Sequence, residues 1–449
     1  MIDLSSAVRL RVKRANTDWW IGEKAVCAAN GKTYIAYCTD MGEIHVKELD
    51  PKCSRAVSRD VCLTRLNSTY ADEHNAPGMC VTENGAILVM YTGHAVGSFR
   101  YRVTTRPFDL DSFWEERYLD FGGSVTYAQV SYNTALNTFW VFSRVDEVNW
   151  SFACSKDGGL TWSKPFRFIR TETGGQTSLY YLHIRKLHFD ADRREYWFFA
   201  VYGHPRSDNR TIRAGLFDDA GNLLDLDLQP CGYSLYDGKN EAFDLAKLTI
   251  VYDAPPKTAV RLLEVSPTLP LRVGLATFDY AAPDTSDDPI AESITYYMAT
   301  YRKGKGFTLS EPITKGGEFL APGQTDGSQT YVGGMACHYG VGNAGLHPVD
   351  GGCPFTDRVY IARFDTQKNA SVLDSFVSTD GGKRYAYEQT VREIPRVEGL
   401  ANERQIKIWR PTVPMYSTEN LPVYWHEGTY SAHTGGWHSD VVMYVEYDD

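Results

Sequence analysis

Short strand-like runs recur along this sequence from end to end. Runs of roughly five to eight alternating or apolar residues are each followed by Gly, Asn or Asp and then by another run. Examples are Lys32–Tyr37, Ala86–Tyr91, Thr138–Ser143, Glu195–Tyr202, Arg358–Phe364 and Val441–Glu446. Long segments with apolar residues at helical spacing are almost absent, and the 29 tyrosines and 10 tryptophans suit pleated strands. The pattern therefore predicts an all-β fold.

Two segments share a turn motif, SKDGGLTW at 155–162 and STDGGKRY at 378–385, and Ala299–Phe307 carries a degenerate copy. The motif resembles the Asp-box of sialidase-type β-propellers. Its Asp and Ser side chains can close a turn through hydrogen bonds to the backbone, while Gly adopts a positive φ. We therefore interpret the motif as a folding device and not as an active site.

The length and the absence of a linker indicate one large propeller. The 449 residues contain no compositional break and no Pro/Ser-rich stretch. At roughly 64 residues per blade the chain would form about seven blades, within the usual range. The prediction is a single seven-bladed β-propeller domain spanning residues 1–449.

Charge and hydropathy exclude several classes of protein. With 46 basic and 56 acidic residues the net charge is −10, and no basic cluster stands out that would bind nucleic acid. A few local arginines can still bind an anionic substrate. No run of about 18 apolar residues predicts a membrane span. The N-terminal residues predict no signal peptide, so we expect either a cytoplasmic protein or a chain without its leader.

Histidine, tyrosine and arginine gather at the ends of successive predicted strands, where a propeller collects its loops at the mouth of the central channel. The residues of this set are His74, Asn75, His94, Tyr127, Arg144, Tyr181, His204 and Arg206. Any one such histidine is most often a hydrogen-bonded structural residue. Four motifs of this kind at successive strand ends predict a functional site.

The same segments carry a family resemblance. DEHNAPG…GAILVMYTGH, TYAQ…FWVFSR, YY…YWFFAVYGHP and YVGGMA resemble the Asp-box propellers that include ulvan lyases, rhamnosyl-glucuronate lyases and a related α-L-rhamnosidase. The similarity runs from about Trp20 to the segment IKIWRPTVP at 406–414. The family it implies is one of polysaccharide lyases that act on acidic glycans.

The resemblance also implies roles for individual residues. His74 and His94 correspond to the paired active-site histidines, Tyr127 to the catalytic tyrosine, and Arg144 to the arginine that binds the uronate carboxylate. Tyr181 is expected to be a second active-site tyrosine, although Tyr180 fits nearly as well. The residues assigned to substrate binding are Asn75, His204, Arg206 and Trp437. For Trp437 the alternatives are a stacking platform for a sugar ring and a surface position on a polar loop.

β-Elimination at a glucuronate explains why these residue types are needed. An arginine bound to the carboxylate stabilises the enolate charge that develops when the C5 proton leaves. A base must take that proton, and an acid must protonate the oxygen that leaves C4. His94 and Tyr127 are the candidates for base and acid, and His74 orients or polarises. We expect no cofactor to be needed for this reaction.

A second candidate site lies near the third quarter of the chain. Cys337 and Cys353 are sixteen positions apart with interleaved histidines such as His338, so a structural zinc ion, or a calcium ion, is one interpretation, although the spacing is not that of a standard zinc finger. The other is a plain loop with two free thiols. The nine cysteines are odd in number and thinly spread, which favours free thiols in a reducing compartment.

Three functions compete at this point. The first is a lyase that cleaves at a glucuronate linked to L-rhamnose, as in ulvan-like or rhamnosyl-glucuronate glycans. The second is an α-L-rhamnosidase that hydrolyses the same bond, although no acidic pair of the kind that hydrolysis usually needs is evident. The third is a carbohydrate-binding propeller without catalysis. In each case we expect an acidic polysaccharide or oligosaccharide as the ligand, with no nucleic-acid or membrane partner.

Overall fold

The regular elements of this protein are β-strands. The computed structural model describes residues 8–17, 22–50, 59–66, 72–146, 149–169, 181–189, 194–203, 211–237, 243, 245–266, 271–279, 292–320, 331–337, 358–416, 423–432 and 434–445. Within these ranges the helices are 3-10 helices of one turn: η1 Glu73–Asn75, η2 Leu110–Ser112, η3 Leu245–Lys247 and η5 Asn402–Arg404. None of them is long or apolar enough to span a membrane. The all-β prediction is confirmed.

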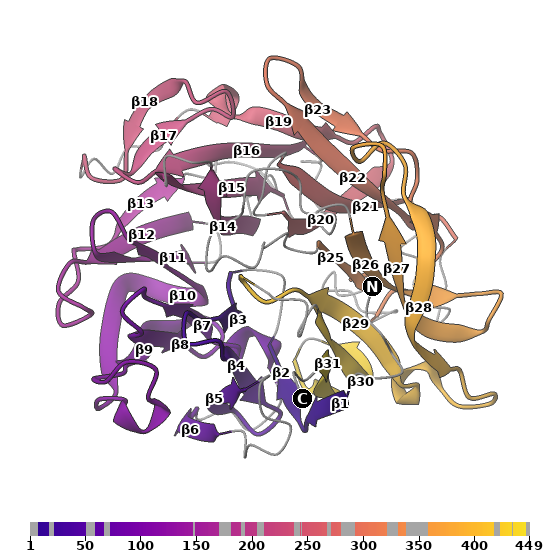
Figure 1. The fold of residues 1–449 in the computed structure, drawn as a ribbon, viewed down its shortest axis with the longest axis horizontal. Helices are drawn as coiled ribbons and strands as arrows, with labels where there is room; N and C mark the ends of the chain where they lie inside the picture. The colour runs from indigo at the N-terminus through magenta and orange to yellow at the C-terminus, as the bar shows by residue number, and fades with distance from the viewer. Residues whose placement is uncertain are drawn as a thin grey trace.

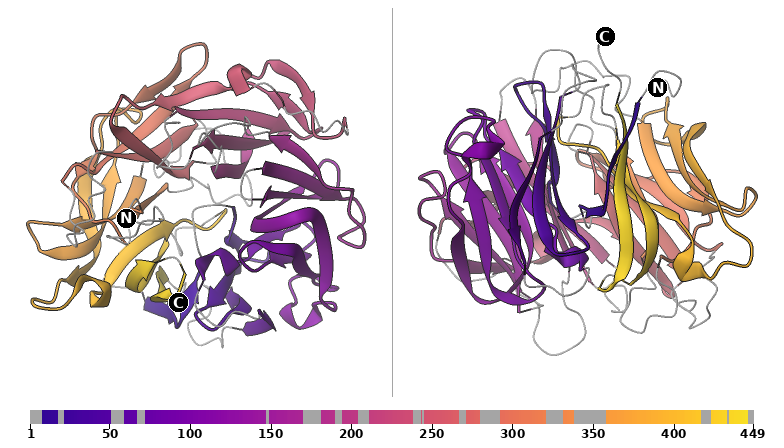
Figure 2. Two further views of the ribbon diagram at one scale, coloured as in Figure 1. Left: turned by 180° about the vertical axis from the view of Figure 1, so that it is seen from behind. Right: turned by 90° about the horizontal axis from the view of Figure 1, so that it is seen from below.

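Antiparallel sheets stand around a central axis in a propeller arrangement (Figure 1), and the right-hand view of Figure 2 shows the same arrangement from the side. The first sheet contains β2 (Ala15–Asn16), β3 (Ala25–Cys27), β4 (Thr33–Thr39), β5 (Glu43–Leu49) and β6 (Asp60–Arg65). The second sheet contains β7 (Gly78–Val81), β8 (Ile87–Tyr91), β9 (Val96–Val103), β10 (Arg117–Asn133), β11 (Thr138–Val145), β12 (Asn149–Ser155) and β13 (Phe166–Ile169).

The third sheet contains β14 (Tyr181–Phe189), β15 (Arg194–Tyr202), β16 (Thr211–Asp218), β17 (Asn222–Leu224), β18 (Pro230–Ser234) and β19 (Thr249–Asp253). The fourth sheet contains β20 (Thr258–Val265), β21 (Arg272–Asp279), β22 (Thr295–Arg302), β23 (Gly306–Leu309) and β24 (Thr314–Lys315).

The fifth sheet contains β25 (Gly334–Cys337), β26 (Arg358–Asp365), β27 (Ala370–Val377) and β28 (Ala386–Pro395). The sixth sheet contains β29 (Lys407–Thr412), β30 (Tyr424–Ala432), β31 (Gly436–Val445) and β1 (Val8–Val12).

The two ends of the chain close the ring. β1 pairs with β31 in antiparallel register from Val8 opposite Val445 to Val12 opposite Val441, so the last sheet is completed by the first strand. A closed ring protects the sheet edges that would otherwise expose unpaired backbone groups. N-terminal and C-terminal segments therefore lie side by side, as Figure 1 shows.

The sheet count differs from the sequence-based prediction of seven blades. The described residues form six hydrogen-bonded sheets, one of which has seven strands. The 17-residue strand β10 is the reason. Residues 117–125 of β10 pair with β9, whereas residues 125–133 pair with β11, and the register shifts in both pairings. One strand thus joins two sets of four strands, β7–β10 and β10–β13, into a single sheet.

The core lies between neighbouring sheets, which explains the continuous apolar runs in the sequence. β11 is buried at all eight positions, because both of its faces are covered by adjacent sheets. Trp140 on β11 meets Trp197 on β15 across one such interface, with ring centroids 4.3 Å apart. Both tryptophans are completely buried.

Both Asp-box segments fold as the sequence predicts. Ser155 donates its hydroxyl to Asp157 and accepts from the Gly159 amide, and the Asp157 carboxylate accepts from the amide of Thr161. Ser378, Asp380 and Gly382 repeat the first two of these bonds in the later copy. The motif closes a turn locally, and its interpretation as a folding device is confirmed.

Candidate active site

The candidate site begins at a one-turn helix that carries His74. Asp72 caps η1, because its backbone is extended and its carboxylate accepts from the His74 amide at 2.9 Å. Immediately after η1, β7 begins at Gly78. A Cβ atom at Gly78 would lie only 2.1 Å from the carbonyl oxygen of Ala128 on β10. Glycine therefore allows the segment that carries His74 to approach β10 closely.

We predict that Gly78→Ala destabilises the fold. The added methyl group meets a backbone oxygen that cannot move aside, so the free energy of unfolding should fall by about 2–3 kcal/mol. Gly97→Ala on β9 is the matched control, since no atom lies within 4 Å of its added Cβ and its backbone is not left-handed. Thermal unfolding of both variants tests this. Equal melting temperatures would contradict the close approach at Gly78.

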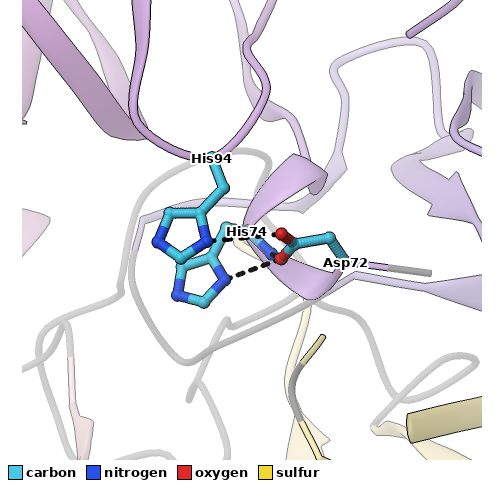
Figure 3. Close-up of side chains that lie close together, drawn as sticks. All are labelled: Asp72, His74 and His94. Atoms are coloured by element: carbon cyan, nitrogen blue, oxygen red, sulfur yellow. Dashed lines mark hydrogen bonds and ion pairs between the residues drawn. The ribbon is translucent and has the colours of Figure 1, made fainter. Parts of the chain in front are cut away.

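His74 and His94 form a stacked pair held by one carboxylate (Figure 3). The imidazole centroids are 3.8 Å apart and the ring planes differ by 9°. One oxygen of Asp72 lies 2.7 Å from Nδ1 of His74, and the other lies 3.3 Å from Nδ1 of His94. His74 is buried, whereas the His94 side chain is one-third exposed. The Ala95 amide donates to Thr126 Oγ1 on β10, which ties the His94 loop to that strand.

The electrostatics of this trio favour an ionised carboxylate. Burial alone would raise the pKa of Asp72, but the charges and hydrogen bonds of His74 and His94 outweigh it and hold that pKa far below its usual range.

Asp72, His74 and His94 also bring three possible metal-ligand atoms within 4.8 Å of one another. The geometry does not fit a shared ion. An imidazole lone pair lies in the ring plane, and two nearly parallel planes separated by a stacking distance cannot both contain the same ion. Hydrogen bonds from the two rings to the carboxylate fit the arrangement better.

Tyr127 and Arg144 lie next to this pair. Tyr127 has a left-handed backbone (φ 65°) and lies at a β-bulge, where the register between β10 and β11 shifts. The bulge therefore changes the direction in which the Tyr127 side chain leaves the strand. Its ring centroid is 5.4 Å from that of His74. The Arg144 guanidinium carbon lies 4.5 Å from the Tyr127 ring centroid, and Arg144 is 1% exposed. Trp150 stacks on Tyr127 at 6.4 Å.

Tyr181 belongs to a second group of aromatic and basic residues. Its ring stacks on Tyr202 at 5.1 Å, and the Arg261 guanidinium lies 5.1 Å from the Tyr181 ring and 4.8 Å from the Tyr331 ring. Burial, and then the neighbouring Tyr181 and Tyr127, hold the pKa of Tyr331 well above its usual value. The Arg410 guanidinium carbon lies 5.9 Å from the Tyr331 ring centroid, so this group reaches a residue that binds Glu73 on η1.

A buried ion pair anchors η1 to the last sheet. Arg410 on β29 donates to both oxygens of Glu73 at 2.7 and 3.1 Å, and the Tyr430 hydroxyl on β30 donates to Glu73 at 2.8 Å. All three side chains are almost completely buried. The turn that holds Asp72 and His74 is therefore fixed by residues more than 300 positions away in sequence.

Two other predicted substrate-binding residues, Asn75 and Trp437, are buried. Asn75 is buried on η1 beside His74. Trp437 on β31 is completely buried in the hydrophobic core, so it offers no ring face on which a sugar could stack. The sequence could not reveal this, because alternation does not identify which face of a strand the neighbouring sheet covers. Because Trp437 is completely buried, both alternatives predicted for it, a stacking platform for a sugar ring and a surface position on a polar loop, are wrong.

The predicted metal site stays a prediction. Cys337 is buried at the end of β25, where burial raises the pKa of its thiol. His338 and Cys353 lie outside the described residues, as do Tyr180, His204 and Arg206.

Several residues of the cluster were not predicted from the sequence. Asp72 and Glu73 directly precede His74 in the DEHNAPG motif, Tyr331 begins YVGGMA, and Arg410 lies in IKIWRPTVP. All four therefore occur in segments that carry the family resemblance, which was the available signal. Arg261 lies outside those segments, and only the ring geometry brings it to the site.

Comparisons with known proteins agree with this architecture. Residues 32–142 match the sequence model of the BNR repeat-containing family, a segment that includes His74, His94 and Tyr127 and ends two residues before Arg144. No curated protein matches the sequence. Among solved structures, an ulvan lyase of polysaccharide lyase family PL25, bound to -[GlcA(1-4)Rha3S]-, superposes with a TM-score of 0.64 at 13% identity, covering 99% of this chain and 96% of that one. The fold is that of an ulvan-lyase propeller.

Two further structures extend the comparison. The same type of PL25 ulvan lyase in another structure gives the same TM-score and coverage. The polysaccharide lyase Uly1 matches with a TM-score of 0.55 at 10% identity, over 95% of this chain and 90% of that one. The propeller fold is therefore shared over nearly the whole length of these chains, and the match to the BNR repeat-containing family model covers residues 32–142 within it.

Proposed function

We propose that this protein is a polysaccharide lyase that cleaves by β-elimination at a glucuronate linked to L-rhamnose. One observation carries the proposal: His74, His94, Tyr127 and Arg144, distributed over 71 positions from 74 to 144, form one contiguous cluster. The cluster combines a buried guanidinium with groups that can transfer protons. The shared fold with ulvan lyases supports the proposal but does not identify the substrate.

Each residue has a role in the proposed reaction. Arg144 binds the carboxylate of the glucuronate and stabilises the enolate charge. His94 and Tyr127 are the base that takes the C5 proton and the acid that protonates the leaving oxygen, in an order that stays open. His74, which stacks between His94 and Tyr127, orients or polarises the group beside it. Tyr181 and Asn75 complete the proposed site, and His204 and Arg206 are proposed to bind substrate.

Hydrolysis is less well supported by this arrangement. Among the described residues, the carboxylates of Asp72 and Glu73 beside the cluster are already engaged, Asp72 by two histidines and Glu73 by Arg410 and Tyr430. A glycosidase of the usual kind needs a pair of carboxyl groups that flank the scissile bond. The engaged carboxylates favour elimination over a rhamnosidase reaction.

The proposal is tested by the products formed from ulvan and from rhamnosyl-glucuronate oligosaccharides. Elimination creates a C4–C5 double bond conjugated with the carboxylate, so we expect near-ultraviolet absorbance and products whose total mass contains no added water. Saturated products that incorporate labelled solvent oxygen would replace the lyase with a hydrolase. Binding without turnover of any of these glycans would favour a non-catalytic propeller.

We also propose a domain count and a blade count. Residues 1–449 are proposed to form one catalytic domain. The strand sets β7–β10 and β10–β13 each have the four strands of a typical blade, and we propose to count them separately, which makes seven blades with the other five sheets.

A further inference from the structure

We propose that Asp72 is a positioning residue that sets the tautomers of His74 and His94 together, so that both rings present an unprotonated Nε2 to the substrate. The inference rests on the proposed function for its catalytic consequence. Its structural part concerns the two rings alone and can be tested without a substrate.

The hydrogen positions on the two rings follow from the atoms that face Asp72. Each oxygen of the Asp72 carboxylate faces the Nδ1 atom of a different ring, at 2.7 Å for His74 and 3.3 Å for His94. An ionised carboxylate only accepts hydrogen bonds, so each Nδ1 must carry a hydrogen. In a neutral imidazole the other nitrogen then has the lone pair. Figure 3 shows the second nitrogen of both rings pointing away from Asp72.

The second feature that supports this role of Asp72 is the set of contacts that hold its backbone in place. Its carboxylate also accepts from the His74 amide, and its main chain forms an isolated bridge with Thr434, which lies between β30 and β31. Glu73, the next residue, is held by Arg410 and Tyr430. The backbone that carries the carboxylate is therefore held by residues outside the histidine pair, as expected of a group that orients catalytic side chains.

Asp72→Asn tests the proposal with little change in shape. Asparagine caps helices as well as aspartate does, so η1 should persist. Its amide offers one accepting oxygen and one donating nitrogen, so only one ring can keep hydrogen on Nδ1, and the other must carry it on Nε2. We expect kcat/KM on the glucuronate substrate to fall by about 10²-fold. Asp60→Asn is the matched control, because Asp60 contacts Nδ1 of His45 at 3.0 Å on the outer strand β6.

The deciding readout is the tautomer of each ring, observed by long-range ¹⁵N–¹H NMR on protein with labelled histidine. His74→Gln and His94→Gln assign the two signals. We expect the Nδ1–H form for both rings in the wild type, and its loss from at least one ring in Asp72→Asn but from neither in Asp60→Asn. The Nε2–H form at either ring in the wild type would overturn the proposal, as would an Asp72→Asn variant with wild-type tautomers.

The two proposals fail in different ways. If the wild type cleaves none of the glycans, the lyase function fails, while the NMR result still decides whether Asp72 sets the tautomers. If the wild type is an active lyase and Asp72→Asn keeps its full kcat/KM, the lyase function stands and the positioning role is overturned.

Discussion

Arg144→Lys is expected to lower kcat/KM on a glucuronate substrate by about 10³-fold, although it conserves the charge. The Arg144 side chain is almost completely buried, and its guanidinium carbon lies 4.5 Å from the Tyr127 ring centroid. Its backbone is held between Thr126 on β10 and Trp150 on β12. A planar guanidinium can contact both oxygens of a carboxylate, whereas an ammonium group is a point charge on a flexible chain.

Arg117→Lys is the control for this substitution. Arg117 also stacks on an aromatic ring, with its guanidinium carbon 4.3 Å from the Trp114 ring centroid, but it belongs to the β9–β10 side of the sheet and not to the cluster. Its variant should keep wild-type kinetics. Steady-state rates from product absorbance, with melting temperatures for both variants, provide the measurement. A folded Arg144→Lys protein with near-normal kcat/KM would show that Arg144 does not bind the carboxylate.

Tyr127→Phe should reduce kcat/KM by about 10³-fold through the loss of a single hydroxyl group. The phenyl ring can keep the contacts of the tyrosine ring with His74, Arg144 and Trp150, which depend on the ring and not on the oxygen. The change therefore removes a proton carrier and leaves the packing intact. Single-turnover rates at saturating substrate would place the effect on the chemical step.

Tyr101→Phe controls for the removal of a buried tyrosine hydroxyl. Tyr101 donates to the carbonyl oxygen of Gly159 at 2.9 Å, away from the histidine pair, so its variant should be less stable but equally active. His94→Ala, measured in parallel, should also lose activity by 10²-fold or more. Wild-type rates for Tyr127→Phe together with inactivity of His94→Ala would assign the proton transfers to histidine and exclude the tyrosine.

Much of the fold could be predicted from local patterns. The run Thr138–Ser143 became β11 (Thr138–Val145), and Lys32–Tyr37 overlaps β4 (Thr33–Thr39). The Asp-box turns at 155–162 and 378–385 formed as expected, because their hydrogen bonds join residues at most four positions apart. The number of separate sheets was not predictable in this way. It depends on whether β10 breaks or continues between β9 and β11, which is a matter of tertiary packing.

The sequence by itself determined the strand pattern, the turns and the residue types of the candidate site. His74, His94, Tyr127 and Arg144 could be selected because each follows or precedes a recognisable strand in a motif shared with a family. The functional groups that these side chains carry follow directly from the sequence.

Only the tertiary structure decided which side chains meet. Closure of the ring brings Arg410 to Glu73, and packing between neighbouring sheets brings Arg261 to Tyr181 and buries Trp437 within the core. No local pattern encodes these contacts, because they join residues far apart in the sequence. The tertiary structure also holds the loop of His94 beside the turn of His74, so that the two oxygens of Asp72 meet two different histidines, and the proposed proton positions depend on this arrangement.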